Sequence, residues 1–334
     1  GYLEGKVAVL LYLVTFFFDW YPNQSSFIFS FRTKDCARAL ANLCSAEKKQ
    51  HIVFRQGGFK IIKTLSYSDS DEIKRYVAIA MRFMAKEYCM QRQDNSEMDE
   101  RGGEDDDVFS LYLDMSDSES LDYQRSASAS LASLSQTEQG RLIIMKHGGI
   151  SAILRLCGHQ DVCVRRSAIY SVANLAAIPD IRRYIVIDGG VEVIRSASVL
   201  NRDVDFLRDS ARSLSTLAVD IAIKEVMVSH DVPKVLSKLA KSVDSETQRF
   251  ASLALSNLCV ATRNEKETIL KQGMLRIISF LLRYPDLEVE RRASLAIAAL
   301  SLGSDENRMA MVDHGFVRLL LETTSYPDLK LRHC

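Results

Sequence analysis

Basic side chains recur along this chain at a near-constant interval, and their type limits the chemistry they can do. The row consists of Lys34, Arg75, Arg125, Arg166, Arg208, Arg249, Arg291 and Arg332. A guanidinium group is planar and can meet a carboxylate in two parallel hydrogen bonds. The row, which we call the basic column, is therefore suited to pairing with the carboxylates of an acidic partner.

Two more columns lie four and eight residues beyond the basic one, and residues four apart share one face of a helix. The second column holds Arg38, Ile79, Ala129, Tyr170, Arg212, Leu253 and Leu295. The third column holds Asn42, Phe83, Ser133, Asn174, Thr216, Asn257 and Ala299. An asparagine amide both donates and accepts hydrogen bonds, so it can hold the backbone of an extended peptide. The residues that we predict to bind a partner are Arg125, Arg166, Tyr170, Asn174, Arg208, Arg212, Arg249, Asn257 and Arg291.

The basic column also has a structural interpretation. An arginine near the start of a helix can solubilise that helix and reach neighbouring turns. However, a positive charge at this place opposes the helix macrodipole by a few tenths of a kcal/mol. Eight repetitions of a mildly unfavourable choice need a further reason. We favour the binding interpretation, and the structural one stays open.

The elements that must carry these columns are helical phrases that repeat. The third column advances in steps of 41, 50, 41, 42, 41 and 42 residues. Self-similarity at this period predicts an α-solenoid, in which each unit buries its apolar face only against its neighbours. In the unit at 138–177, one apolar run ends at Gly148, a second follows, and a longer helix carries the columns. That helix places Ala168, Val172 and Leu175 on one face.

Glycine separates the first two runs of most units. It stands at Gly57, Gly148, Gly189, Gly273 and Gly315, and Asp231 takes its place in one unit. The phrases IMKHGGISAILRL and LKQGMLRIISFLL, together with ALANL and ALSNL, resemble the armadillo repeat. The resemblance covers about 32–334 and implies an all-α, right-handed α-solenoid of about seven armadillo repeats. HEAT repeats, which usually have two helices per unit and lack this glycine, are the structural alternative.

The repeat pattern also predicts how the chain is divided. We assign 1–30 to an atypical apolar segment, 31–92 to the first armadillo units, 93–123 to an acidic insertion loop and 124–334 to the continuing array. Inside the insertion, the apolar phrase at 108–113 is expected to supply a substitute second helix.

The resemblance implies that the third helix of each unit lines a concave groove, which places the three columns in that groove. Importin α-like proteins carry tryptophan four residues before the asparagine and grip lysine-rich nuclear localisation signals. Here that column contains no tryptophan, and the only one in the chain is Trp20. The sequence therefore looks more like β-catenin-like or vacuolar-type armadillo adaptors, which bind acidic or mixed segments.

The net charge conceals an uneven distribution. With 43 basic and 43 acidic residues the chain is neutral overall, which argues against a nucleic-acid partner. Between 93 and 123, however, twelve acidic residues accompany one basic residue. Runs of like charge usually form solvated loops; the alternative is a strap that covers the basic column and competes with acidic partners. Seven cysteines without a CxxC pair predict a reduced, intracellular chain. We expect it in the cytoplasm, and the nucleus is the second location considered.

The apolar run Val7–Phe18 stands outside the repeats. It is twelve residues long, whereas a membrane-spanning helix needs about 20. An anchor, an additional capping helix and translated noncoding sequence are three interpretations of it. Vacuolar-type adaptors are lipidated near the N-terminus, but no acylation motif is visible here. Membrane association stays open.

No catalytic signature stands out. The chain contains no GxGxxG, GxxxxGK[ST], HExxH or GxSxG motif. Cys157, His159 and Cys163 lie close in sequence, but no second pair of ligands accompanies them, so we interpret them as packing and turn residues. We predict no catalytic, cofactor or metal site.

The sequence thus predicts a non-catalytic scaffold that binds an extended, acidic protein segment in a basic concave groove. Two alternatives are a membrane-associated adaptor of the vacuolar type and an accessory repeat region of a larger enzyme, such as a ubiquitin ligase.

Overall fold

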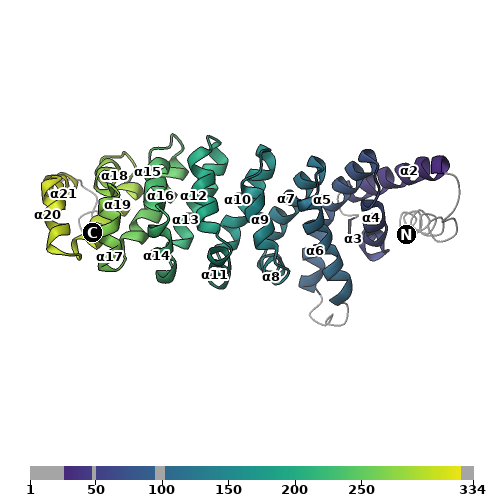
Figure 1. Cartoon of the computed structure of the whole chain (residues 1–334), viewed down its shortest axis with the longest axis horizontal. Coiled ribbons are helices and arrows are strands. Elements are labelled where there is room, and N and C mark those ends of the chain that lie inside the picture. Colours follow the sequence, from purple (N-terminus) through teal and green to yellow (C-terminus); the bar gives the residue numbers. More distant parts are fainter. Residues whose placement is uncertain (1–25, 47–49, 95–101, 325–334) are drawn as a thin grey trace. The chain divides into compact units, whose positions relative to one another are not determined.

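The computed structural model describes residues 26–46, 50–94 and 102–324, and within these ranges every regular element is an α-helix (Figure 1). The chain divides after Ser171 into two compact units. The helices of the first unit are α2 Ser26–Ser45, α3 Gln50–Arg55, α4 Gly58–Ser66, α5 Asp71–Asp94, α6 Gly102–Asp117, α7 Leu121–Ser135, α8 Glu138–Lys146 and α9 Gly149–Cys157. The boundary between the units falls within the next helix, α10 Val162–Leu175.

The second unit continues with repeating triplets, each made of two short helices and one longer one. They are α11 Pro179–Ile187, α12 Gly190–Leu200 and α13 Val204–Leu217; α14 Ile221–Ser229, α15 Val232–Leu239 and α16 Ser245–Cys259; α17 Arg263–Lys271, α18 Met274–Leu281 and α19 Leu287–Ser301. A last pair, α20 Asp305–Asp313 and α21 Phe316–Thr324, begins the next repeat.

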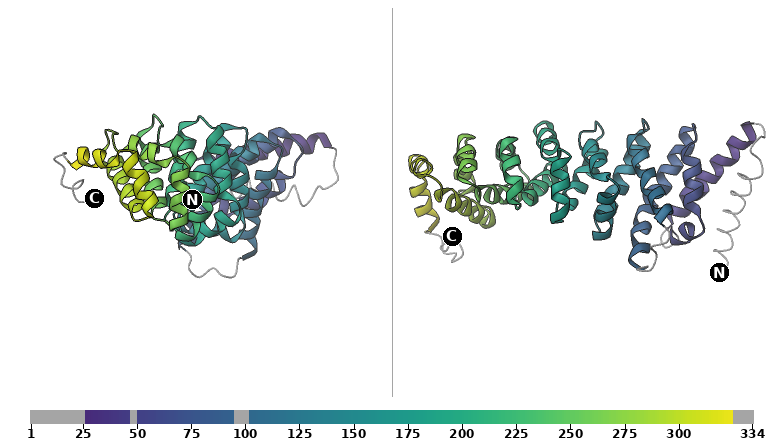
Figure 2. Two further views of the ribbon diagram at one scale, coloured as in Figure 1. Left: turned by 60° about the vertical axis from the view of Figure 1, so that its left-hand side comes forward. Right: turned by 60° about the horizontal axis from the view of Figure 1, so that its bottom comes forward.

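Third helices of successive repeats pack against one another within each unit. In the first unit α2 packs on α5 and α5 on α7; in the second, α13 packs on α16 and α16 on α19 (Figures 1 and 2). Each contributes one apolar face, and Leu214, Leu258 and Leu300 are at most 1% exposed. Burial of such side chains is worth about 2 kcal/mol each, so stacking of the triplets supplies the core.

The predicted apolar face of the helix at 162–175 is confirmed. Ala168, Val172 and Leu175 are all buried in α10. Their spacing of four and three residues places them on one side of the helix. The prediction of an all-α solenoid built from three-helix repeats is thus confirmed in each unit.

The glycine position between the first and second helices requires a left-handed backbone. Gly148 has a φ of 70° and Gly273 a φ of 79°. Asp231 takes the equivalent place with a φ of 57°, and among the described residues it is the one non-glycine residue with positive φ. A left-handed residue reverses the chain between two short helices, which is why glycine recurs there.

The segment at 93–123, which we predicted to be an acidic loop, is largely helical within the described residues. α5 continues to Asp94, α6 covers Gly102–Asp117, and 95–101 lie outside the described ranges. The helix forms because Phe109, Tyr112 and Met115 are buried. The Tyr112 hydroxyl donates a hydrogen bond of 3.0 Å to the Met81 carbonyl. Apolar side chains at helical spacing thus outweigh the charge run.

The helices α5 and α6 also explain how the longest repeat step is accommodated. α6 packs on α9 as a second helix, the role predicted for the apolar phrase at 108–113. α5 is 24 residues long and packs on α8. In the second unit, the matching contact joins two first helices, α14 and α17. An extended third helix therefore stands in for a separate first helix.

The N-terminal apolar run Val7–Phe18 lies outside the described residues. α2 begins at Ser26, within the segment that we assigned to the atypical N-terminus. Among the described residues, no helix combines the length and apolar character needed to span a membrane.

Candidate functional site

The basic column lies along the third helices, and its members form ion pairs that link neighbouring repeats. Arg125 contacts Asp161 at 2.6 Å, Arg208 contacts Asp244 at 2.8 Å and Arg249 contacts Asp286 at 2.9 Å. The pattern extends to the first repeats, through Lys34–Glu72 at 2.5 Å and Arg75–Asp122 at 3.0 Å. In all five pairs the carboxylate belongs to the start of the following third helix.

The carboxylates in these pairs have a second task, because several cap helices. Asp244 accepts a hydrogen bond of 2.9 Å from the backbone N–H of Thr247, in the first turn of α16. The hydrogen bond from Arg208 holds the pKa of Asp244 well below its usual range, and Arg125 similarly lowers the pKa of Asp161. One aspartate thus satisfies a helix N-terminus and holds the arginine of the preceding repeat.

Two further members of the basic column, Arg166 and Arg291, also have partners, and the last, Arg332, lies outside the described residues. Arg291 pairs with Glu288 of its own helix at 2.8 Å. Arg166 is exposed and likewise takes part in a polar interaction. The structural interpretation, in which an arginine near a helix start reaches a neighbouring turn, therefore describes the contacts made by Arg125, Arg208 and Arg249.

The second and third columns lie partly or fully exposed on the same helices. In the second unit, Arg212 donates a hydrogen bond of 3.2 Å to Asn174 Oδ1 and pairs with Asp209 at 3.0 Å. Asn257 Nδ2 donates to the Ser215 carbonyl at 3.2 Å. These amides are thus positioned by bonds between repeats, while part of each side chain stays accessible.

The structure distributes the predicted site residues over both units. Arg125 lies on α7, and Arg166 and Tyr170 lie on the part of α10 that belongs to the first unit. The second unit holds Asn174, Arg208, Arg212, Arg249, Asn257 and Arg291. Within the second unit, packing of α13, α16 and α19 brings the last five of these onto neighbouring helices.

Sequence reasoning missed the carboxylates that pair with the basic column. A signal for them exists, because Asp161, Asp244 and Asp286 each stand five residues before a member of that column. An aspartate before a helical phrase is a typical N-cap. Recognising that the cap of one repeat reaches the arginine of the preceding repeat, however, requires the stacking distance between helices.

The Cys157, His159 and Cys163 cluster serves different local roles. Cys157 is fully buried in α9, and burial raises the pKa of its thiol. His159 Nδ1 accepts a hydrogen bond of 3.0 Å from the Asp161 backbone N–H, whereas Cys163 is exposed. Over the described ranges, no group of three or more His, Cys, Asp or Glu residues is arranged to hold a metal ion.

Comparison with known proteins identifies the fold. The chain matches no protein-family model and no curated protein sequence. Solved structures do match. An engineered protein is 24% identical with a TM-score of 0.72, covering 98% of this chain and 75% of its own. A second engineered protein is 27% identical with a TM-score of 0.61, covering 68% and 92% respectively.

Designed armadillo repeat proteins are also among the similar structures. One, crystallised in complex with the peptide (KR)4, is 16% identical with a TM-score of 0.61 and covers 66% of this chain and 94% of its own. Another, designed for modular peptide recognition, is 17% identical with a TM-score of 0.63 over the same shares. These similarities identify the fold of this chain as an armadillo-type repeat array.

Proposed function

We propose that this chain is a non-catalytic protein-binding scaffold that holds an extended segment of a partner against its third helices. The observation that carries this proposal is the surface of α13, α16 and α19, whose inner faces are buried while their second and third columns stay accessible. Side by side, these columns offer apolar side chains such as Leu253 and Leu295 and polar ones such as Asn257. Many weak contacts of this kind add along an extended partner.

The designed armadillo repeat protein in complex with (KR)4 supports binding of a peptide by this fold. That peptide is basic, so it lends no support to an acidic partner. The preference of this chain for acidic segments, and its closeness to β-catenin-like or vacuolar-type adaptors, rest on its own residues.

An acidic segment would have to share the basic column with the internal aspartates. Arg208 uses three of its five N–H donors on Asp244 and Asp205, and Arg249 uses two on Asp286 and Glu246. The arginine side chains are 36% and 45% exposed, respectively. Their remaining donors can meet a partner's carboxylates, but the surrounding acids reduce the attraction. We therefore propose a modest preference for acidic segments.

Calorimetry with three capped twelve-residue peptides of equal length, one acidic, one uncharged and one basic, tests this function. We expect saturable binding, with the acidic peptide tightest. The double variant Asn174→Ala, Asn257→Ala should bind about ten-fold more weakly, because the backbone of the peptide loses its contacts with two side-chain amides. Asn264→Ala, an exposed asparagine on the first helix α17, is the matched control and should leave binding unchanged.

Two outcomes would contradict different parts of the proposal. Binding that is absent, or equal in the double asparagine variant and the wild type, would remove the third-helix surface as the site. Tightest binding of the basic peptide would leave the scaffold intact and reject only the acidic preference.

A further inference from the structure

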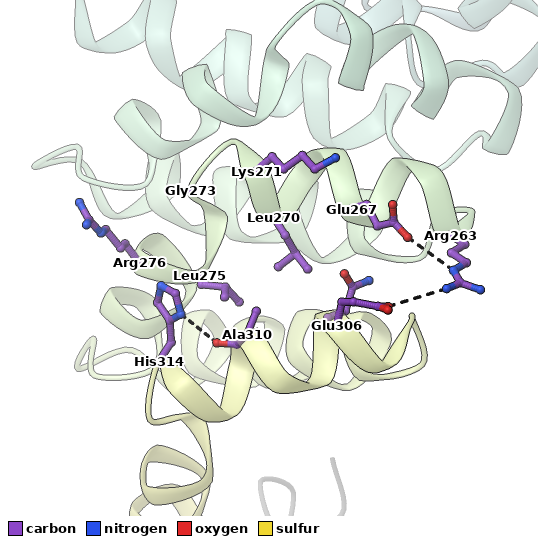
Figure 3. A pocket seen from close by; sticks show the side chains of 11 residues that line it. Arg263, Glu267, Leu270, Lys271, Gly273, Leu275, Arg276, Glu306, Ala310 and His314 are labelled. Carbon is purple, nitrogen blue, oxygen red and sulfur yellow. Dashed lines mark hydrogen bonds and ion pairs between the residues drawn. The ribbon is translucent and has the colours of Figure 1, made fainter.

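A cleft lies in the second unit, on first and second helices rather than third ones. Figure 3 shows this cleft, about 710 Å³ in volume, between α17 and α18 on one side and α20 on the other. Leu270, Leu275 and Ala310 occupy its middle. Leu275 is buried and the other two are half-buried, so the cleft has an apolar floor that a partner could cover.

One end of the cleft is basic, with side chains that the fold leaves without acidic partners. Arg276 and His314 lie together at this end, and Lys271 lies on the rim (Figure 3). All three are exposed, and among the described residues neither Lys271 nor Arg276 makes an ion pair or a side-chain hydrogen bond. His314 Nδ1 lies 2.8 Å from the Ala310 carbonyl oxygen, which can only accept. The imidazole Nδ1 therefore carries a proton, and Nε2 is left for a ligand.

The opposite end of the cleft is closed by an ion-pair bridge of one arginine and two glutamates. Arg263 of α17 lies 3.4 Å from Glu267 on its own helix and 3.8 Å from Glu306 on α20 (Figure 3). Since one arginine meets two glutamates, this end carries a net negative charge, and the two ends of the cleft differ in sign. The cleft has an acidic end, an apolar floor and a basic end.

The position that carries Arg276 varies between repeats. Arg276 stands three residues after the positive-φ glycine of its repeat, and the matching positions hold Lys60, Ser151, Glu192, Lys234 and Arg318. Lys234 pairs with Asp231 at 2.9 Å. Arg318 pairs with Glu322 at 3.0 Å on its own helix. Since the residue type and its pairing differ from repeat to repeat, an arginine at this position is not a requirement of the stacking.

We propose that this cleft binds a short acidic–hydrophobic peptide segment of a partner protein. An aliphatic or aromatic side chain of the segment covers Leu270, Leu275 and Ala310, and an adjoining carboxylate pairs with Arg276. Burial of the apolar side chain supplies affinity, and the charge-assisted hydrogen bonds orient the segment. This site is separate from the third-helix surface and does not depend on the proposed function of that surface.

Fluorescence polarisation with a labelled, capped decapeptide of alternating Asp and Leu tests the proposal on the whole chain. We expect saturable binding, which falls about ten-fold when the leucines are replaced by serine or the aspartates by asparagine. Arg276→Glu should weaken binding about ten-fold or more by turning attraction into repulsion. Ala310→Phe should do the same by filling the floor. Arg318→Glu is the matched control in the next repeat and should stay within about two-fold of wild type.

The outcomes separate this proposal from that for the third-helix surface. It is overturned if the decapeptide does not bind, if both cleft variants bind it as wild type does, or if the serine version binds equally well. Weakening by the paired Asn174→Ala and Asn257→Ala substitutions, with no effect of the cleft variants, would assign the decapeptide to the third helices and also overturn it. Thermal melts of Ala310→Phe and Arg276→Glu show that the variants fold.

Discussion

Two regions of the second unit use the same residue types in opposite ways. Along the third helices, the pairs Arg208–Asp244 and Arg249–Asp286, which we call the seam, join each arginine to an aspartate of the next repeat. In the cleft beside α20, Arg276 meets no carboxylate among the described residues. A charge that is paired between repeats serves the stacking of the array. A charge that meets no carboxylate among the described residues is therefore the better indicator of a partner.

The seam also answers why a mildly unfavourable choice is repeated. An arginine near a helix start opposes the dipole of its own helix. In the folded array, however, Arg208 points to the cap of the following helix, where Asp244 also accepts the backbone N–H of Thr247. The favourable contact lies between repeats, so the energetic effect of Arg208 cannot be derived from its own helix alone.

The largest effect that would test this comparison is expected at the seam. Asp244→Ala removes a helix cap and leaves Arg208 without its main partner, so the free energy of unfolding should fall by about 2 kcal/mol. Urea denaturation measures it. Asp205→Ala is the control, since Asp205 is exposed and contacts Arg208 at 3.1 Å without capping α13. Equal losses in the two variants would show that the seam is no more than surface charge.

The same pair sets a dependence on pH. Because the pKa of Asp244 is lowered in the folded chain, its stabilising effect is complete above the unfolded pKa of about 4 and is lost as the pH falls below it. Urea denaturation between pH 7 and pH 3 should therefore show that the free energy of unfolding falls less steeply with decreasing pH for Asp244→Ala than for the wild type. An equal decrease in the two proteins would contradict this role of Asp244.

A smaller effect of opposite sign is expected at Glu290, which lies on α19 next to Arg291 in the sequence. Its side chain is 4% exposed, its Oε1 has no hydrogen-bond partner among the described residues, and burial raises its pKa. The stability associated with the protonated form is present below the unfolded pKa of about 4.3 and is lost as the pH rises. Glu290→Gln should therefore stabilise the chain by about 1 kcal/mol at pH 7.

Thermal melts at pH 7 and pH 4 check this prediction, and the gain should shrink at pH 4. Glu246→Gln, at an exposed glutamate of α16, is the control and should change little. A destabilised Glu290→Gln at both pH values would mean that the carboxylate has a partner that its burial conceals.

The smallest effect concerns the one described repeat in which a residue other than glycine adopts the left-handed conformation. Asp231 adopts the left-handed conformation that glycine holds in the other repeats. Asp231→Gly should raise the free energy of unfolding by about 0.5 kcal/mol, because relief of the backbone outweighs loss of the exposed pair with Lys234. Urea denaturation measures the change, and Lys234→Ala gives the cost of the ion pair alone. A loss of more than that cost would show that Asp231 contributes elsewhere.

The repeat and its helices were predictable, whereas the neighbours of the columns were not. Ala168, Val172 and Leu175 are buried as their spacing predicts, and the positions of Gly148 and Asp231 match. The loop predicted at 93–123 was wrong for Gly102–Asp117, because the buried Phe109 stabilises a helix there. The prediction of a loop considered the run of acidic residues, but not the hydrophobic core that the apolar residues among them could join.

By itself, the sequence determined the three-helix period, the apolar faces and the left-handed turns, because these depend on contacts within a few residues. Only the tertiary structure decided which carboxylate each arginine meets, since Arg208 and Asp244 are 36 residues apart and are joined by the stacking of α13 on α16. The cleft is likewise a product of packing, as α17, α18 and α20 each supply part of it. Helical periodicity is local, whereas charge pairing and concavity follow from the distance between repeats.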